Sequence, residues 1–405
     1  MCVWPSCRFR RLFTAAAFAA ASLLALVLPA TAQSGKPVEA FQTSAPYAIL
    51  IDADSDTVLF EKGADQLTAP SSMAKLMTAE YVFNEIKEGR VKLDDEFIVS
   101  ENAWRRGGAP SGGSTMFAAI HSRVRVEDLI RGMIIPSGND ACIALAEGIS
   151  GNESEFAALM TKRARAIGLT KSTFTNSNGL PDPNQKVTVR ELAKLAQYIV
   201  RNYPERYKIF GELEFTWNKI RQQNRNPLLT MGIGADGLKT GFTREGGYGV
   251  VGSAVQNGLR LIVVINGLKT GKDRADEARK LLEWGFRTFD ARYLFAEGET
   301  VGEAKIYGGD HGKVALVADR AIKILVPRSM GEKLVAKIVY AGPVRAPVEQ
   351  GQLIGKLKVW RGDSVALEVP LRAGTSVAKG SLAQRAFDAA GELMISMFRA
   401  GVERL

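Results

Sequence analysis

Cysteine is scarce in this chain of 405 residues, which contains only three. Cys2 and Cys7 lie close to the N-terminus, in a segment that we expect to be removed, so Cys142 is left alone. A single cysteine cannot form an intrachain disulfide, even in an oxidising compartment. Cys142 lies in an apolar helical stretch, where a small buried side chain is a better interpretation than a nucleophile.

Histidine is scarcer still, because His121 and His311 are the only two. They are far apart in the sequence and lack the spacing of metal ligands. A zinc site or a Ser-His-Asp triad would have to use one of them. We expect both to be surface or packing residues, and we predict no metal site.

Clustered charge of one sign is also missing, although the formal net charge is +10. Lysine and arginine are scattered among aspartate and glutamate, with no arginine-rich run and no alternation of basic and aromatic residues. The pattern therefore predicts no nucleic-acid partner. A basic protein that is exported would instead meet anionic lipid or an anionic wall polymer.

Long apolar runs are absent except at the N-terminus, where FTAAAFAAASLLALVL follows three arginines. A small-x-small cleavage site, ATA, stands at 30–32, so we predict a signal peptide over 1–32 and a mature chain that begins at Gln33. The run is too short, and its flanks are wrong, for a membrane span. An uncleaved anchor remains the alternative. Export places the protein in the periplasm.

Turn signals and hydrophobic periodicity organise the next part of the chain. Residues 47–62 and 247–268 each read as a strand hairpin, the second around an Asn-Gly pair suited to positive φ. Residues 126–200 are mostly helical in pattern, and a charged amphipathic helix is expected over 276–295. This order predicts an α+β fold of the β-lactamase/transpeptidase kind, with helices packed on an antiparallel sheet.

The pattern changes after about residue 297 to short β-type runs separated by Gly, Pro and Asp, namely KVALVAD, AIKILVP, AKIVYAG, GKLKVW and SVALEVP. We therefore predict a serine peptidase domain over 33–296 and a small all-β domain over 297–378. RAGTSVAKG, over 372–380, reads as a linker to a C-terminal helix over 379–405.

The C-terminal helix carries apolar residues along one broad face and charges every few residues. Such a helix cannot span a bilayer but can lie on one, so we predict peripheral membrane contact through 381–405, on the outer face of the inner membrane. Packing on the β domain or on a partner is the alternative.

The first candidate for chemistry is PSSMAKLMTA, in which Ser72 and Lys75 are three residues apart at an expected helix start. On a helix they share one face. The helix N-terminus supplies N–H groups that can stabilise an oxyanion. A lysine can act as base where burial or another positive charge lowers its pKa. Ser71 has Ala74 at that spacing, so we expect Ser71 to be a cap.

Each motif has similar copies elsewhere in the chain, so one motif alone is weak evidence for a catalytic site. Ser376 and Lys379 repeat the first spacing in the expected linker. Ser137-Gly138-Asn139 opens an apolar helix, whereas similar triplets at Ser100 and Ser150 are expected to cap one helix and to close another. A third motif, Lys239-Thr240-Gly241, enters the second hairpin, and a copy stands at 269–271.

The order of the three motifs is more specific than any one of them. A helix-borne S-x-x-K, then S-x-N, then K-T-G before a hairpin resembles the penicillin-recognising serine peptidases and β-lactamases. PSSMAKLMTA, LIRGMIIPSGNDACIALAE and DGLKTGFTREGGYGVVGSA look most like the low-molecular-weight penicillin-binding proteins, the D-alanyl-D-alanine carboxypeptidases. The resemblance covers about residues 45–295.

The resemblance implies a serine-type carboxypeptidase that removes the terminal D-alanine from peptidoglycan stem peptides through an acyl-enzyme, is acylated by β-lactams and uses no cofactor. It implies Ser72 as nucleophile and Lys75 as base, with the pKa of Lys75 lowered partly by the charge of Lys239. Ser137 would relay a proton to the leaving amine. The oligomeric state is left open.

Substrate-binding roles are also implied by the resemblance, for Asn139, Lys239, Thr240, Gly241 and Arg260. Arg260 would match the additional carboxylate-binding arginine of the family, with a solvated strand residue as alternative. The backbone N–H groups of Ser72 and Phe242 would form the oxyanion hole. Phe242 and Asn178 depart from the family: several relatives carry His or Tyr at the position of Phe242, and Asn178 replaces a histidine that is common there.

Three other functions stay open. A murein D,D-endopeptidase would cut crosslinks with the same residues. A β-lactamase is disfavoured, because residues 175–190 contain no E-x-x-x-N of the class A kind and PDPN is no substitute. A non-catalytic scaffold would bind the envelope through its β domain.

Overall fold

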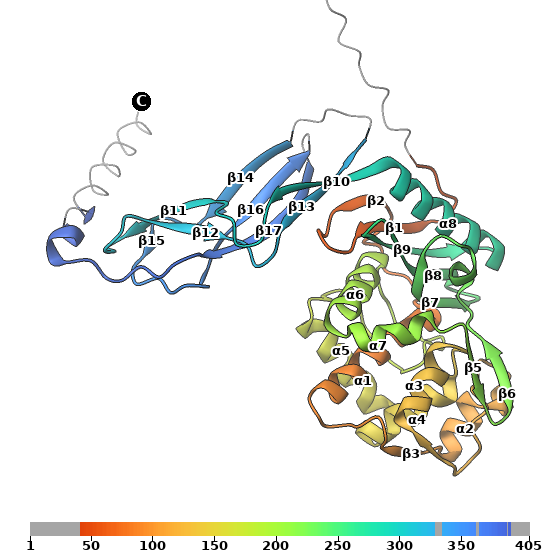
Figure 1. Cartoon of the computed structure of the whole chain (residues 1–405). Helices are drawn as coiled ribbons and strands as arrows, with labels where there is room; N and C mark the ends of the chain where they lie inside the picture. The colour runs from red at the N-terminus through yellow and green to blue at the C-terminus, as the bar shows by residue number, and fades with distance from the viewer. Residues whose placement is uncertain (1–40, 329–333, 362–363, 387, 390–405) are drawn as a thin grey trace, which may run out of the picture. The chain divides into compact units, whose positions relative to one another are not determined.

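The computed structural model describes residues 41–328, 334–361, 364–386 and 388–389. The predicted signal peptide and most of the predicted C-terminal helix lie outside these residues. Figure 1 shows helices gathered around one sheet in the first part of the chain, and a strand-rich part that follows it in sequence.

The central sheet has five antiparallel strands in the order β2-β1-β9-β8-β7. Their bounds are β1 Tyr47–Asp52, β2 Val58–Lys62, β7 Ala235–Thr243, β8 Gly247–Gln256 and β9 Leu259–Leu268. Both predicted hairpins are confirmed. Asn257 and Gly258 have φ values of 50° and 77°, the left-handed conformation that a tight hairpin turn needs.

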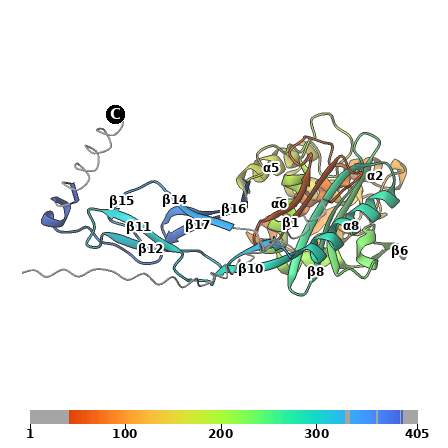
Figure 2. The ribbon, with the colours of Figure 1, turned by 90° about the horizontal axis from the view of Figure 1, so that it is seen from above.

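Helices cover both faces of this sheet (Figures 1 and 2). Alternate residues of β9 divide between two cores: Ile262 and Val264 join the larger helical core, whereas Leu261 and Val263 pack with α8. The main helices are α1 Lys75–Lys87, α3 Val126–Ile134, α4 Asn139–Ser150, α5 Glu153–Ala166, α6 Val189–Asn202 and α8 Gly271–Thr288. This α+β fold agrees with the prediction.

Shorter elements complete this part of the chain. They are α2 Glu101–Gly107, α7 Pro204–Tyr207, the strand pairs β3 Glu96–Ile98 with β4 Arg123–Arg125 and β5 Glu214–Trp217 with β6 Ile220–Gln223, and the 3-10 helices η1 Ser71–Ala74, η2 Ala109–Ser111, η3 Lys208–Gly211 and η4 Pro227–Thr230. Ser100 caps α2 and Ser150 ends α4, as expected. Thr270, in the second K-T-G, caps α8.

The helix expected over 276–295 is only partly right. Helix α8 ends at Thr288, and β10, Phe289–Phe295, pairs antiparallel with β13, Ile322–Pro327. The partner strand lies about thirty residues further along the chain, and strand propensity depends on such neighbours. A local helical pattern could not reveal this pairing.

The strand-rich part contains a sheet of six strands in the order β14-β16-β17-β12-β11-β15. They are β11 Gly302–Tyr307, β12 Lys313–Val317, β14 Leu334–Tyr340, β15 Val344–Arg345, β16 Leu353–Arg361 and β17 Ser364–Ala373. All five predicted β-type runs lie in strands. The segment read as a linker is not free, because Val377 is buried and bridges Val348.

The scarce side chains lie as expected. Cys142 is buried, and its thiol donates to the carbonyl of Gly138 at 3.2 Å. His121 and His311 are exposed. Among the described residues, His, Cys, Asp and Glu form no group of three or more that could hold a metal ion.

Candidate active site

Ser72 and Lys75 lie where the 3-10 turn η1 runs into α1. Side chains three residues apart eclipse in a 3-10 turn, and Lys75 Nζ accordingly lies 3.0 Å from Ser72 Oγ. Lys75 is only 1% exposed, which is rare for a lysine. The hydroxyl expected to attack and the amine expected to activate it are therefore in hydrogen-bond contact.

The amine of Lys75 has two further acceptors, Asn139 Oδ1 at 2.8 Å and the carbonyl oxygen of Asn178. Burial lowers the pKa of Lys75, and the charge of Arg225 lowers it further. Arg225 adds to the effect that the sequence analysis expected from Lys239, whose own pKa is lowered by the charge of Lys75. A lowered pKa makes a neutral amine accessible, and a neutral amine can accept the serine proton.

Ser71 is not the helix cap that the sequence analysis expected. Its φ of 51° is left-handed, whereas a cap residue needs extended backbone, and no side chain caps η1. The Ser71 hydroxyl lies 2.9 Å from Thr243 Oγ1 instead. Ser71 therefore ties the turn that carries Ser72 to strand β7.

Ser137 brings a second hydroxyl to the same pocket. Its Oγ is buried and has no hydrogen-bond partner among the described residues, and the residue has a φ of 66°. Buried polar atoms are nearly always paired, so an unpaired hydroxyl that lines a pocket is available to a bound molecule. Asn139 follows two residues later as the first residue of α4.

Strand β7 carries the third motif along the edge of the central sheet. Lys239 is 2% exposed; burial and then the charge of Lys75 hold its pKa well below the usual value. Gly241 lies against the turn that carries Ser72, where a Cβ would come within 3.0 Å of the carbonyl oxygen of Pro70. Glycine therefore allows η1 and β7 to approach closely.

The pocket itself has a volume of about 510 Å³. Its lining consists of Ser72, Ser114, Ser137, Arg225, Thr240, Gly241, Phe242, Tyr248 and Arg274. Two of these are arginines and none is acidic, so the lining favours an anionic ligand. Phe242 is half exposed and stacks on Tyr248, with ring centroids 4.1 Å apart.

Arg225 and Arg274 are the site residues that sequence reasoning missed. Burial lowers the pKa of both guanidinium groups. Arg274 Nε is buried without a hydrogen-bond partner among the described residues, and the guanidinium lies 5.7 Å from the ring centroid of Tyr248. Neither arginine belongs to a short motif, so only the folded chain reveals them.

Arg260 does not reach this pocket, which corrects the sequence prediction. The guanidinium forms an ion pair with Asp236 at 2.8 Å and lies 2.6 Å from Ser253 Oγ. Through β8, Thr240 is aligned with Ile265 on β9, five residues from Arg260. At strand spacing that is about 17 Å. Arg260 is not the solvated strand residue of the alternative either, because its side chain is only 21% exposed and is ion-paired.

Buried carboxylates hold the loops around the site. Asp140 accepts hydrogen bonds from Thr115 Oγ1 at 2.6 Å and from the backbone N–H groups of Met116 and Ala118. Asn139 N–H donates to the carbonyl oxygen of Ser114 at 2.8 Å. The loop that carries Ser114 is therefore fixed against the start of α4.

Comparison with known proteins places this geometry in a family. The family model described as D-alanyl-D-alanine carboxypeptidase matches residues 32–270, and the one described as penicillin-binding protein 5, C-terminal domain, matches residues 289–379. The chain belongs to the D-alanyl-D-alanine carboxypeptidase family. The resemblance drawn from its motifs is confirmed, and the chain is a serine hydrolase of this class.

Individual relatives support the same family assignment. D-alanyl-D-alanine carboxypeptidase DacC of Escherichia coli (strain K12) is 38% identical over 373 residues, which cover 91% of this chain and 93% of the relative. The crystal structure of penicillin binding protein 5 from Haemophilus influenzae superposes with a TM-score of 0.76 at 37% identity, covering 84% of this chain and all of that one.

A third structure was solved with a bound antibiotic. Penicillin-binding protein D2 from Listeria monocytogenes, in its cefotaxime-bound form, is 27% identical with a TM-score of 0.53. The alignment covers 61% of this chain and 99% of the Listeria chain.

The boundaries of the predicted domains, 33–296 and 297–378, stay predictions.

Proposed function

We propose that this enzyme removes the terminal D-alanine from peptidoglycan stem peptides through an acyl-enzyme on Ser72. The observation that supports this best is the buried amine of Lys75, 3.0 Å from Ser72 Oγ, at a pocket whose lining is cationic. An amine with a lowered pKa can take the serine proton at neutral pH.

Acylation would begin when neutral Lys75 accepts the proton of Ser72 Oγ–H. The oxygen then attacks the carbonyl carbon of the penultimate D-alanine, and the negative charge moves to the carbonyl oxygen. The backbone N–H groups of Ser72 and Phe242 would stabilise that oxyanion. Edge strands leave alternate N–H groups unpaired, and β7 is an edge strand.

Collapse of the tetrahedral intermediate breaks the bond to the leaving nitrogen, which needs a proton. Ser137 Oγ lines the pocket and has no hydrogen-bond partner among the described residues, so with substrate bound it would pass a proton from the Lys75 ammonium to that amine. D-alanine then leaves. Water attacks the Ser72 ester with Lys75 again as base, and the shortened peptide is released.

The terminal carboxylate of the substrate would meet the cationic side of the pocket. Thr240, Arg225 and Arg274 line it, and Lys239 lies buried beside Thr240. Asn139 would hold Lys75 and the substrate amide. The β-lactams carry a reactive carbonyl and a carboxylate, so we propose that they acylate Ser72, in keeping with the cefotaxime-bound relative.

Export to the periplasm and peripheral contact with the membrane belong to the same proposal. The signal peptide over 1–32 and the helix over 381–405 support them from sequence alone. Of the helices that the structure describes, none is both long and apolar enough to cross a bilayer.

The deciding experiment measures release of D-alanine from a pentapeptide ending in D-Ala-D-Ala by the wild type and Ser72→Ala. We expect release by the wild type and none by the variant. Ser376→Ala is the matched control, because Ser376 has the same lysine spacing away from the pocket. Absence of release by the wild type, with cleavage of crosslinked muropeptides, would transfer the assignment to an endopeptidase. Fluorescent penicillin that still labels Ser72→Ala would exclude Ser72 as nucleophile.

A further inference from the structure

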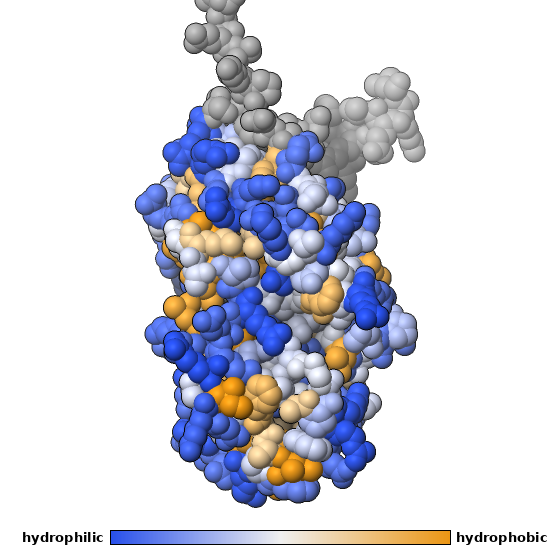
Figure 3. Space-filling view, turned by 90° about the vertical axis from the view of Figure 1, so that its right-hand side faces the viewer, coloured by the Kyte–Doolittle hydropathy of each residue, from blue (hydrophilic) through white to orange (hydrophobic). Residues whose placement is uncertain are grey.

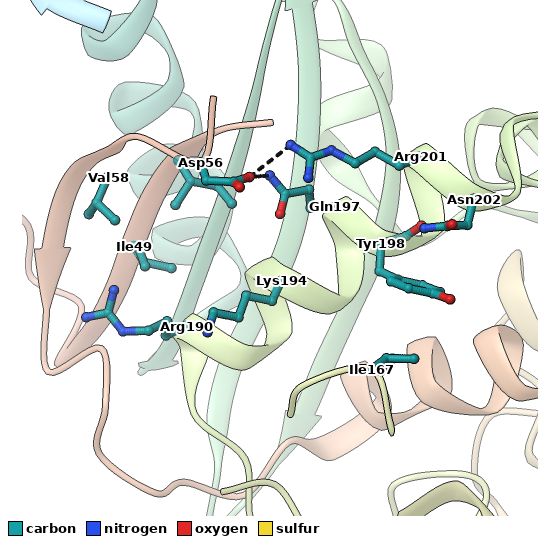
Figure 4. A pocket seen from close by; sticks show the side chains of 11 residues that line it. Ile49, Asp56, Val58, Ile167, Arg190, Lys194, Gln197, Tyr198, Arg201 and Asn202 are labelled. Carbon is teal, nitrogen blue, oxygen red and sulfur yellow. Dashed lines mark hydrogen bonds and ion pairs between the residues drawn. The ribbon is translucent and has the colours of Figure 1, made fainter. Parts of the chain in front are cut away.

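A second pocket lies between the β1–β2 hairpin and α6 (Figure 4). It has a volume of about 350 Å³, within the range of small-molecule sites. Its lining is Ile49, Ile51, Asp56, Val58, Ile167, Arg190, Lys194, Gln197, Tyr198, Arg201 and Asn202. None of these residues lines the catalytic pocket.

The two pockets are on different parts of the sheet. β9 and β8 separate β1 from β7, which at ordinary strand spacing is about 14 Å. The second pocket is therefore a separate feature and not an extension of the peptide-binding cleft.

One wall of this pocket is apolar. Ile49 and Ile51 of β1 lie behind this wall with 0% and 5% of their surface exposed, whereas Val58 of β2 and Ile167, which follows α5, are partly exposed. The opposite wall is the face of α6 on which Arg190, Lys194, Gln197 and Arg201 recur at helical spacing. An occupant therefore meets aliphatic side chains on one side and cations on the other.

Two of the three cations are already neutralised. Arg190 pairs with Glu61 at 2.5 Å and with Asp65 at 2.8 Å. Arg201 pairs with Asp56 at 2.8 Å, and Gln197 also donates to Asp56, as the dashed lines in Figure 4 show.

Lys194 differs from both arginines. Among the residues that the structure describes, it has no hydrogen-bond or ion-pair partner. One unpaired positive charge beside an aliphatic wall favours a ligand that carries one negative charge on an apolar body. The carboxylates of Asp56, Glu61 and Asp65 would repel a ligand with several negative charges.

We propose that this pocket binds an amphiphilic monoanion, a medium-chain carboxylate in chemical class, with the carboxylate at Lys194 and the chain against Val58 and Ile167. The binding combines an ion pair at an exposed lysine with burial of apolar surface. It requires no step of the catalytic reaction, so the proposed function stands or falls separately.

Exposed apolar surfaces give less support for a further binding site than the second pocket does. Figure 3 shows a largely hydrophilic face on which apolar residues form small separate patches. Among exposed apolar side chains, Leu213 and Ile220 lie on or beside the β5–β6 hairpin, and Phe117 lies in the loop that Asn218 contacts. The second pocket combines shape, apolar surface and an unpaired charge in one place.

The test is a titration of the purified protein with the fluorescent anion 8-anilinonaphthalene-1-sulfonate, followed by displacement with decanoate, decanol or inorganic phosphate. We expect decanoate to displace the probe at a concentration about threefold lower than decanol, and phosphate to have no effect. Equal displacement by decanoate and decanol, or no saturable binding, would overturn the proposal.

Variants place the binding in this pocket. Lys194→Glu should weaken decanoate about tenfold, and Lys194→Gln less. Lys162→Glu, at an exposed lysine on α5 that has no partner in the described part of the chain, should change it less than about twofold. Val58→Thr keeps side-chain shape and should weaken decanoate modestly. Equal effects at Lys162 and Lys194 would contradict the site. Penicillin labelling and thermal melting check folding, and Lys194→Gln decides the question if Lys194→Glu does not fold.

Discussion

Glu153 Oε1 accepts a hydrogen bond from Asn178 Nδ2 at 3.0 Å, and the carbonyl oxygen of Asn178 in turn accepts one from Lys75. The same carboxylate oxygen holds Ser177 Oγ at 2.7 Å. Glu153 is buried at the start of α5, so a carboxylate outside the pocket fixes the loop that orients the base. Glu153 is therefore a positioning residue.

The charge of Glu153 also raises the pKa of Lys75, against the dominant effect of burial. We expect Glu153→Gln to lower that pKa. If Lys75 is the proposed base and acts when neutral, the acidic limb of the kcat/KM profile should move to lower pH, by about half a unit. Glu155→Gln, at an exposed carboxylate in the same helical turn, is the control. A profile that moves to higher pH, or equal shifts in both variants, would contradict this role.

Asn139→Asp should shift the profile in the opposite direction. A carboxylate 2.8 Å from Lys75 Nζ would stabilise the ammonium and raise its pKa. At pH 7 the rate of acylation by a fluorescent penicillin should fall at least about tenfold and recover partly as the pH rises. Asn139→Ala separates charge from lost orientation, because it should lower the rate without shifting the acidic limb upward. A rate for Asn139→Asp that does not depend on pH would rule out Lys75 as the titrating base.

Ser137→Ala should separate activity from stability. The hydroxyl has no partner among the described residues, so its removal costs no hydrogen bond and should change the free energy of unfolding by less than about 0.5 kcal/mol. If Ser137 relays the proton to the leaving amine, D-alanine release should fall by about 10²–10⁴-fold. Urea unfolding and product release, measured on one preparation, test both parts. A normal rate would leave Ser137 without a catalytic role.

Local sequence patterns were enough to predict much of the fold. The Asn257-Gly258 turn, the helix that follows Ser72 and the β-type runs after residue 297 could each be recognised from a few consecutive residues. The order of three short motifs was enough to suggest the family. Ser72, Lys75 and Asn139 could be named because each stands inside a motif, and the fold brings them into hydrogen-bond contact.

Contacts between segments that are far apart in the sequence determine the features that the sequence analysis did not predict. Phe289–Phe295 is a strand because its partner is Ile322–Pro327, and Ser71 bonds to Thr243 because β7 passes beside η1. The wrong choice of Arg260 in place of Arg274 has the same cause. Arg260 was selected for its position in a strand after K-T-G, but register places it along the sheet beside Asp236. Arg274 enters the pocket from the first turn of α8.

Substitution of the two arginines tests that correction directly. Arg274→Gln should lower kcat/KM for a peptide ending in free D-Ala-D-Ala at least about tenfold, because a charge-assisted contact with the terminal carboxylate is lost. It should have little effect on the same peptide with a C-terminal amide. Arg260→Gln should leave the ratio of the two substrates unchanged and instead destabilise the protein by about 1–2 kcal/mol, since Asp236 and Ser253 lose a partner. Loss of carboxylate discrimination in Arg260→Gln, with Arg274→Gln unaffected, would restore the original assignment. Chemical unfolding, run beside the kinetics, distinguishes a lost contact from a lost fold.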